Sequence, residues 1–157
     1  MSILITGSAG YEPTHTLQEG LRDSLGVIFD QVGTPTYARD LAKAILDIVG
    51  QLDCRATLAV TNPPSLRGTK QSQSDVQIYN YSNEGVCSWY DFAKEIMKMA
   101  KLDCQINPIE TVDYPTPAKR PHYSLLNKTK IKSTFNIEIP YYKDGLDDCL
   151  IRLGERR

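Results

Sequence analysis

Two stretches of the chain place apolar residues at helical spacing, three or four positions apart. Asp40 precedes the first stretch as a candidate N-cap, and Gly50 is placed to end that helix or to loosen it near its end. Ser88 and Asp91 form a capping-box pattern at the start of the second stretch. The apolar positions are Leu41, Ala44, Ile45, Ile48, Val49 and Leu52 in the first stretch and Trp89, Phe92, Ala93, Ile96 and Ala100 in the second. The pattern predicts two amphipathic helices.

Shorter apolar or alternating runs predict strands around these helices. Strands are expected at 3–5, 27–29, 76–81 and 104–109, a turn at 33–36, and short helices near 129–135 and 144–153. Leu17, Leu21 and Leu25 give weak helical character to the polar stretch near 11–24. Helices and strands that alternate in this way favour an α/β or α+β domain.

Residues 61–77 have a different character from the rest of the chain. They are polar, lack any period and include Pro63, Pro64 and Gly68. An aperiodic stretch of this length is usually functional or disordered. Because it offers almost nothing apolar to bury, we expect a disordered insertion.

The composition excludes several classes of protein. A chain of 157 residues with a net charge of −1 favours one domain and gives no indication of a nucleic-acid binder. Its apolar runs fall short of the ~20 residues that span a bilayer, and its first residues lack the features of a signal peptide. The four cysteines and two histidines are too scattered for a zinc site. We therefore expect a cytoplasmic protein with free thiols and no membrane partner.

Three blocks of sequence carry a resemblance to a known family. They are DQVGTPTYARDLAKAI at 30–45, IYNYSNEGVCSWYDFAKEIM at 78–97 and YPTPAKRPHYSLLNKTKI at 114–131. In order and spacing they resemble the C-terminal half of dTDP-4-dehydrorhamnose reductase, an extended short-chain dehydrogenase/reductase. That family reduces dTDP-4-dehydro-6-deoxy-L-mannose to dTDP-L-rhamnose with NADH or NADPH, in rhamnose and cell-surface polysaccharide biosynthesis. The resemblance implies an α/β fold, with a Rossmann-type NAD(P)-binding domain and a smaller portion that helps hold the nucleotide sugar.

The N-terminus resembles the cofactor-binding turn of this family only in part. Gly7 and Gly10 fit the first two glycines of the family's Gly-x-x-Gly-x-x-Gly pattern, whereas Pro13 stands at the third. An ordinary turn after a strand is the alternative interpretation. One βαβ unit takes about 30 residues, and a complete cofactor domain contains several such units. We therefore expect residues 1–29 to be a truncated Rossmann remnant and residues 30–157 to be the substrate-binding portion.

The family's catalytic pair is Tyr-x-x-x-Lys on a helix, in which the lysine lowers the pKa of the phenol. Tyr90 and Lys94 match this spacing. They fall in a helix of the C-terminal region and not on the catalytic helix of the cofactor domain, so we assign no catalytic residue. We expect the chain alone to bind no NADH or NADPH and to be inactive, because the reaction then has no hydride donor.

Two segments are candidates for nucleotide-sugar binding. Thr34, Pro35 and Thr36 match a loop close to the family's substrate pocket, although a rigid turn before the helix explains them as well. Arg120 is the best single candidate, because a guanidinium binds a pyrophosphate through bidentate, charge-assisted bonds and related nucleotide-sugar enzymes use an arginine of the C-terminal portion in this way. A solvated surface arginine is the alternative. Trp89 could stack on a base or sugar, but its spacing favours core packing.

Three functions remain open at this point. The chain is a nucleotide-sugar reductase, a non-catalytic module that binds a nucleotide sugar or an intact homologue, or the product of a decaying gene. A magnesium ion and a dimer occur in some members of the family, but we assign no metal site here. The apolar helix faces at 40–52 and 88–100 would rest partly on the sheet of an intact relative, so we expect self-association or partial disorder.

Overall fold

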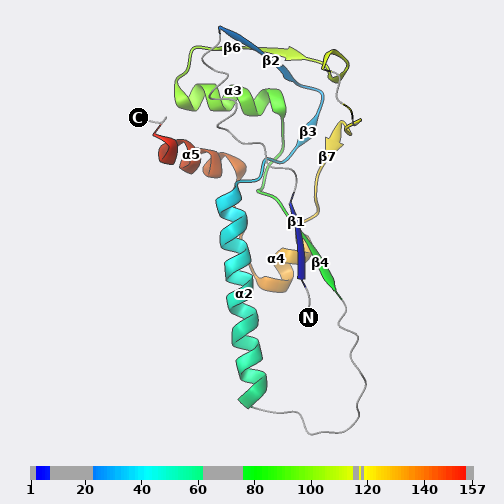
Figure 1. The fold of residues 1–157 in the computed structure, drawn as a ribbon, viewed down its shortest axis with the longest axis vertical. Coiled ribbons are helices and arrows are strands. Elements are labelled where there is room, and N and C mark those ends of the chain that lie inside the picture. Colours follow the sequence, from blue (N-terminus) through cyan, green and yellow to red (C-terminus); the bar gives the residue numbers. More distant parts are fainter. Residues whose placement is uncertain (1–2, 8–22, 62–75, 115–116, 118, 155–157) are drawn as a thin grey trace.

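The computed structural model describes residues 3–7, 23–61, 76–114, 117 and 119–154 (Figure 1). Helices and strands alternate along this part of the chain, which gives an α/β fold. The strands are β1 (Ile3–Gly7), β2 (Ser24–Ile28), β3 (Val32–Gly33), β4 (Gln77–Tyr81), β5 (Cys87–Ser88), β6 (Gln105–Ile109) and β7 (Tyr123–Ser124). The helices are α2 (Ala38–Thr61), α3 (Trp89–Ala100), the 3₁₀ helix η1 (Thr111–Asp113), α4 (Thr129–Phe135) and α5 (Tyr142–Leu153).

The strands form three small sheets. β1 pairs with β4 and β2 pairs with β6, in both cases in parallel. β3 lies in the middle of the third sheet, antiparallel to β5 and parallel to β7. The sheets therefore bring together segments that are far apart in the sequence, such as Gly33 and Ser124. The division of the chain at residue 29 stays a prediction.

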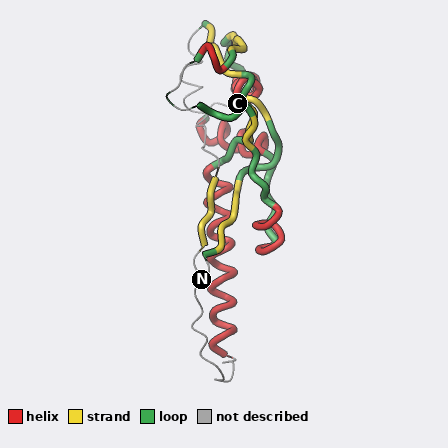
Figure 2. The backbone as a smooth tube through the Cα atoms, turned by 90° about the vertical axis from the view of Figure 1, so that its right-hand side faces the viewer, coloured by secondary structure: helices red, strands yellow, loops and turns green. Residues whose placement is uncertain are grey.

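Helix α2 begins earlier and ends later than the sequence pattern indicates. It begins at Ala38, so Asp40 lies in the first turn and the N-cap prediction is wrong. The Asp40 carboxylate instead accepts a hydrogen bond from the side chain of Asn83. The helix also continues through Gly50 to Thr61, since one glycine inside a helix costs only about 1 kcal/mol relative to alanine. Figures 1 and 2 show the end of α2 extending well past β1, β4 and α4.

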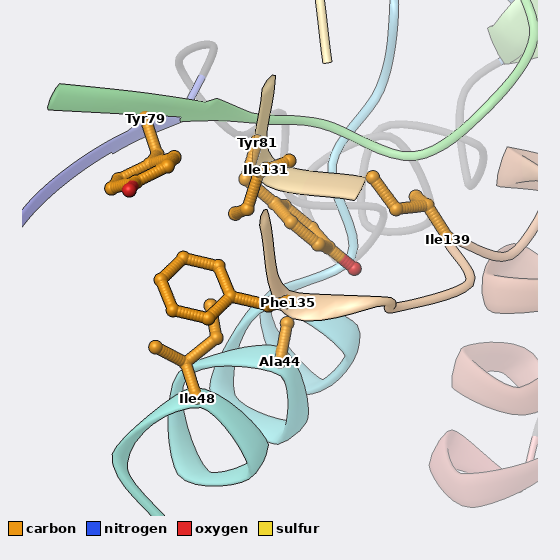
Figure 3. Close-up of a cluster of buried hydrophobic side chains, with 7 residues drawn as sticks. All are labelled: Ala44, Ile48, Tyr79, Tyr81, Ile131, Phe135 and Ile139. Carbon is orange, nitrogen blue, oxygen red and sulfur yellow. The ribbon is translucent and has the colours of Figure 1, made fainter. Parts of the chain in front are cut away.

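One hydrophobic core joins α2, β4 and α4. The rings of Tyr79 and Phe135 pack with their centroids 5.0 Å apart, and both side chains are buried. Alternation along β4 directs Tyr79 and Tyr81 into this core and leaves Ile78 53% exposed. The buried members, drawn in Figure 3, are Ala44, Ile48, Tyr79, Tyr81, Ile131, Phe135 and Ile139. Ala44 and Ile48 thus confirm part of the apolar face predicted for the first helix.

Helix α3 begins with the predicted capping box. The Ser88 hydroxyl accepts the backbone N–H of Asp91, and the Asp91 carboxylate accepts the backbone N–H of Ser88. The apolar face of α3 packs on α5 through one cluster and on β2 and β6 through another. Its buried residues are Phe92, Ala93, Ile96, Met97 and Ala100. This face, which we expected to be partly uncovered, is therefore buried.

The remaining predicted elements differ in outcome. The strands predicted at 76–81 and 104–109 are confirmed as β4 and β6, and the helix near 129–135 is confirmed as α4. Helix α5 begins at Tyr142, two residues before the predicted start. The weak helix expected near 11–24 is wrong at Leu25, which lies in β2, and residues 11–22 lie outside the described part.

The stretch expected to be a disordered insertion lies mostly outside the described residues. Its first residue, Thr61, ends α2, and Gln77 begins β4; nothing is described between 62 and 75. In the part of the chain that is described, no helix has both the length and the apolar character to cross a bilayer. Cys87, a free cysteine, is half-buried, and burial raises the pKa of its thiol to about 11, so the thiol is protonated at neutral pH.

Candidate functional site

Strands β3 and β7 place the two predicted binding segments on one strand pair (Figure 1). The backbone N–H of Val32 donates to the carbonyl of His122 at 2.7 Å. Because the two strands are parallel, the chain after β3 and the chain before β7 lie at opposite ends of the pair. Residues 34–36 therefore leave one end of the pair, and Arg120 precedes the other.

Buried contacts fix the loop that follows β3. Thr34 is 6% exposed, and its hydroxyl donates to the carbonyl of Gly85 at 3.0 Å. Pro35 is buried and Thr36 is half-buried. The Thr34 side chain therefore fastens this loop to the segment after β4.

Asn83 is fully buried where this loop meets the start of α2. Its side-chain oxygen accepts the backbone N–H of Tyr37 at 2.9 Å. Its side-chain nitrogen donates to the Asp40 carboxylate at 2.6 Å and to the Pro140 carbonyl at 3.3 Å. One side chain thus joins the loop after β3, helix α2 and the segment before α5.

A half-buried lysine, Lys128, continues this network. The Lys128 ammonium group donates to the Asn83 carbonyl at 2.8 Å and lies 3.0 Å from the Glu84 carboxylate. Lys132 makes a second ion pair with Glu84 at 2.5 Å. Burial raises the pKa of Glu84, but the bonds from Lys132 and Lys128 outweigh burial and hold that pKa below its ordinary value. The segment before α4 is therefore anchored to Asn83 and Glu84.

A second polar cluster fastens the start of α2 to α5. The Asp148 carboxylate accepts hydrogen bonds from Arg152, Arg39 and the Tyr37 hydroxyl, each at 2.9 Å. The bonds from Arg152 and Tyr37 lower the pKa of Asp148 to about 2. Burial, followed by the hydrogen bond to Asp148, raises the pKa of Tyr37. Tyr37 is therefore a neutral donor that links the loop after β3 to α5.

A third polar cluster lies at the other end of the strand pair. One Asp30 oxygen accepts both the backbone N–H of Thr111 at 3.0 Å and its hydroxyl at 2.7 Å. The hydroxyl also accepts a bond from Gln31, which is 6% exposed. His122 Nδ1 lies 3.1 Å from the Asp30 carbonyl oxygen and 3.5 Å from its carboxylate. The Thr111 hydroxyl bond is the main cause that lowers the pKa of Asp30.

Arg120 comes two residues before His122 of this cluster, and it lies on the surface. It is exposed, and so are Tyr123, at 65%, and Tyr114, at 57%. A guanidinium suits phosphate oxygens, while exposed aromatic rings suit the face of a base. The segment from 114 to 123 therefore carries the side-chain types that a nucleotide requires.

The rejected catalytic pair lies on α3. Tyr90 is half-buried against the cluster that joins α3 to β2 and β6, and Lys94 is exposed. Trp89 is half-buried at the first position of the helix. That neither Tyr90 nor Lys94 is catalytic stays a prediction.

Only a fragment of the predicted cofactor turn is described. Gly7 is the last residue of β1, and Gly10 lies outside the described residues. The described residues therefore supply one glycine of that turn, and the absence of cofactor binding stays a prediction. Within the described ranges, no three His, Cys, Asp or Glu side chains gather as metal ligands would.

A groove of about 820 Å³ lies between α2 and the segment before α5. Asp40, Lys43, Asp47 and Glu138 give it charged walls, and Tyr81 also lines it. None of the residues that we predicted for the site lines this groove. It is therefore distinct from the strand pair of β3 and β7.

Three residues that organise this region, Asp30, Asn83 and Thr111, were not predicted from the sequence. Asp30 and Asn83 lie inside the blocks that carry the family resemblance, and this position was the signal that could have pointed to them. Thr111 lies outside those blocks. Their partners are 43 to 92 residues away in the sequence, so no local pattern connects them.

Comparison with known proteins places this arrangement in a family. Residues 13–154 match the family described as the RmlD substrate binding domain. The chain belongs to this family. A dTDP-4-dehydrorhamnose reductase of Aggregatibacter actinomycetemcomitans is 36% identical over 123 residues, which cover 74% of this chain and 36% of that protein.

Solved structures of similar reductases share the fold of this RmlD-family chain. A dTDP-4-dehydrorhamnose reductase of Clostridium acetobutylicum matches with a TM-score of 0.76 and 26% identity, over 97% of this chain and 49% of that one. The Bacillus anthracis enzyme, solved in complex with NADP, matches with a TM-score of 0.71 and 25% identity, over 94% of this chain and 46% of that one. The family resemblance and the Rossmann-like α/β fold class are therefore confirmed. The chain spans about two-fifths of the length of the curated relatives that it matches.

Proposed function

We propose that this chain binds a dTDP-linked deoxyhexose along the strand pair of β3 and β7. Arg120 binds the pyrophosphate at one end, and Thr34, Pro35 and Thr36 border the sugar at the other. The observation that carries the proposal is the parallel pairing of β3 with β7, which puts both predicted segments on one element. Membership of a substrate-binding family supports it, and relatives named for a dTDP-sugar give the substrate class.

The chemistry of the Arg120 segment favours a nucleoside diphosphate over a neutral sugar. The guanidinium of Arg120 is exposed and offers a planar fork of donors that matches two phosphate oxygens. Tyr123, one position past His122, exposes its ring to solvent and could stack on thymine. The sugar then extends toward the loop after β3, which the Thr34 hydroxyl holds in place.

The reductase reaction itself is not the function that we propose for the isolated chain. A named relative was solved with NADP, whereas the described residues of this chain include only Gly7 from the predicted cofactor turn. We propose that the chain alone holds neither NADH nor NADPH and does not reduce dTDP-4-dehydro-6-deoxy-L-mannose. An assay that follows NADPH absorbance with this substrate tests the proposal, and turnover above background contradicts it. The cytoplasm stays our predicted location.

Calorimetry with dTDP-L-rhamnose tests the binding function. The intact chain should bind, and Arg120→Ala should weaken binding by at least about tenfold, because a bidentate contact with a phosphate is lost. Lys119→Ala is the matched control, since it removes the adjacent exposed cation and should change affinity less than about twofold. An absence of binding, or equal effects of the two substitutions, would contradict the proposal.

A further inference from the structure

We propose that Asp30 is a positioning residue for the nucleotide-sugar site, which holds the segment that carries Arg120 against β3. This inference rests on the proposed function, because it takes Arg120 to be the pyrophosphate ligand. Asp30 itself precedes β3, and we do not propose that it contacts the ligand. Its effect on binding would therefore act through the position of Arg120.

A single carboxylate makes contacts on two sides. One oxygen accepts the backbone N–H and the hydroxyl of Thr111, at 3.0 and 2.7 Å, and so fixes the first residue of η1. The other oxygen faces His122 Nδ1 at 3.5 Å, and the Asp30 carbonyl oxygen lies 3.1 Å from the same nitrogen. Asp30 thus joins two segments that lie 81 and 92 residues away in the sequence.

The contact with His122 reaches the ligand segment by a short path. His122 is two residues after Arg120, and Pro121 between them restricts the backbone. The His122 carbonyl also accepts the Val32 backbone N–H at 2.7 Å, at the first residue of β3. The imidazole and the carbonyl of His122 therefore both hold the approach to β7 against the start of β3.

The remaining contacts of the cluster explain why Asp30 is firmly placed. The Asp30 side chain is 22% exposed, whereas the His122 side chain is 71% exposed. The Thr111 hydroxyl donates to Asp30 and accepts from buried Gln31, which fixes its orientation. Without these contacts an exposed loop arginine would sample many positions, and binding would cost more conformational entropy.

The test measures both ligand affinity and local backbone order in two independent variants. Asp30→Ala removes the carboxylate, and Thr111→Val removes the hydroxyl that fixes it, while Thr111→Ser keeps that hydroxyl as the control. We expect the first two to weaken dTDP-L-rhamnose binding about three- to tenfold, and Thr111→Ser to retain the affinity of the intact chain. Hydrogen exchange without ligand should become faster at the Val32 amide and stay unchanged at the Ile96 amide in α3.

The outcomes separate this inference from the proposed function. If the intact chain does not bind, or Arg120→Ala does not weaken binding, the proposed function fails and the inference fails with it. If Arg120→Ala weakens binding while Asp30→Ala and Thr111→Val retain full affinity, only the inference fails. Faster exchange at Ile96 as well as Val32 would show a general loss of stability, and it would overturn the positioning role.

Discussion

The side-chain oxygen of Asn83 accepts the backbone N–H of Tyr37 at 2.9 Å, across 46 residues of sequence. Asn83 is fully buried, so its replacement leaves the Tyr37 amide without an acceptor and the Asp40 carboxylate without its donor. We expect Asn83→Ala to lower the free energy of unfolding by about 2–4 kcal/mol. Urea denaturation measures this, and Asn107→Ala, whose side chain accepts a hydrogen bond from exposed Gln105, should change stability by less than about 0.5 kcal/mol. Equal losses in the two variants would contradict the central role of Asn83.

Gly85 occupies a position that admits no side chain. Its φ is +94°, and a Cβ there would overlap Tyr141 Cε2 and lie 2.8 Å from Tyr142 Cδ1. We expect Gly85→Ala to lower the free energy of unfolding by about 3 kcal/mol, through backbone strain and overpacking. Gly154 also has a positive φ, of +75°, but has open space around it, so Gly154→Ala should cost only about 1 kcal/mol. If the two variants unfold at the same urea concentration, the steric argument is wrong.

The sequence predicted the elements whose signals are local. The helix at Trp89–Ala100 followed from its apolar period and from the Ser88–Asp91 capping box, which involve neighbouring residues. The start of α2 was not predictable, because Asp40 bonds to Asn83 in the fold instead of capping the helix. The partners of Asp30 were likewise hidden, since hydrogen bonds across 81 and 92 residues leave no periodic signal.

Acid should weaken the link between α2 and α5. The bonds from Arg152 and Tyr37 lower the pKa of Asp148 from 3.8 to about 2 in the folded chain. A pKa that is lower in the folded chain stabilises it fully above the unfolded value, and this stability is lost as the pH falls from about 4 to about 2. The free energy of unfolding of the intact chain should therefore fall more steeply in this range than that of Asp148→Asn. Parallel pH profiles of the two proteins would exclude this contribution.

The outer face of α2 is the candidate surface for self-association. Leu46 is 71% exposed, Val49 47% and Ile45 38%, so three apolar side chains meet solvent within five residues of one helix. We expect the sedimentation coefficient to rise with protein concentration, and Leu46→Glu to abolish the rise. Ile151→Glu, at a 55% exposed position on α5, is the control and should leave the rise intact. A chain that sediments as a monomer at every concentration would refute this prediction.

The binding of a nucleotide sugar along β3 and β7 is tested most directly by nuclear magnetic resonance of the backbone amides. Titration with dTDP-L-rhamnose should shift the amides of Thr34 and Thr36 at one end of the strand pair and of Arg120 at the other. The same titration should leave the amides around the α2 groove, such as that of Asp47, unchanged. Shifts confined to that groove, or no shifts at a saturating concentration of ligand, would contradict the account.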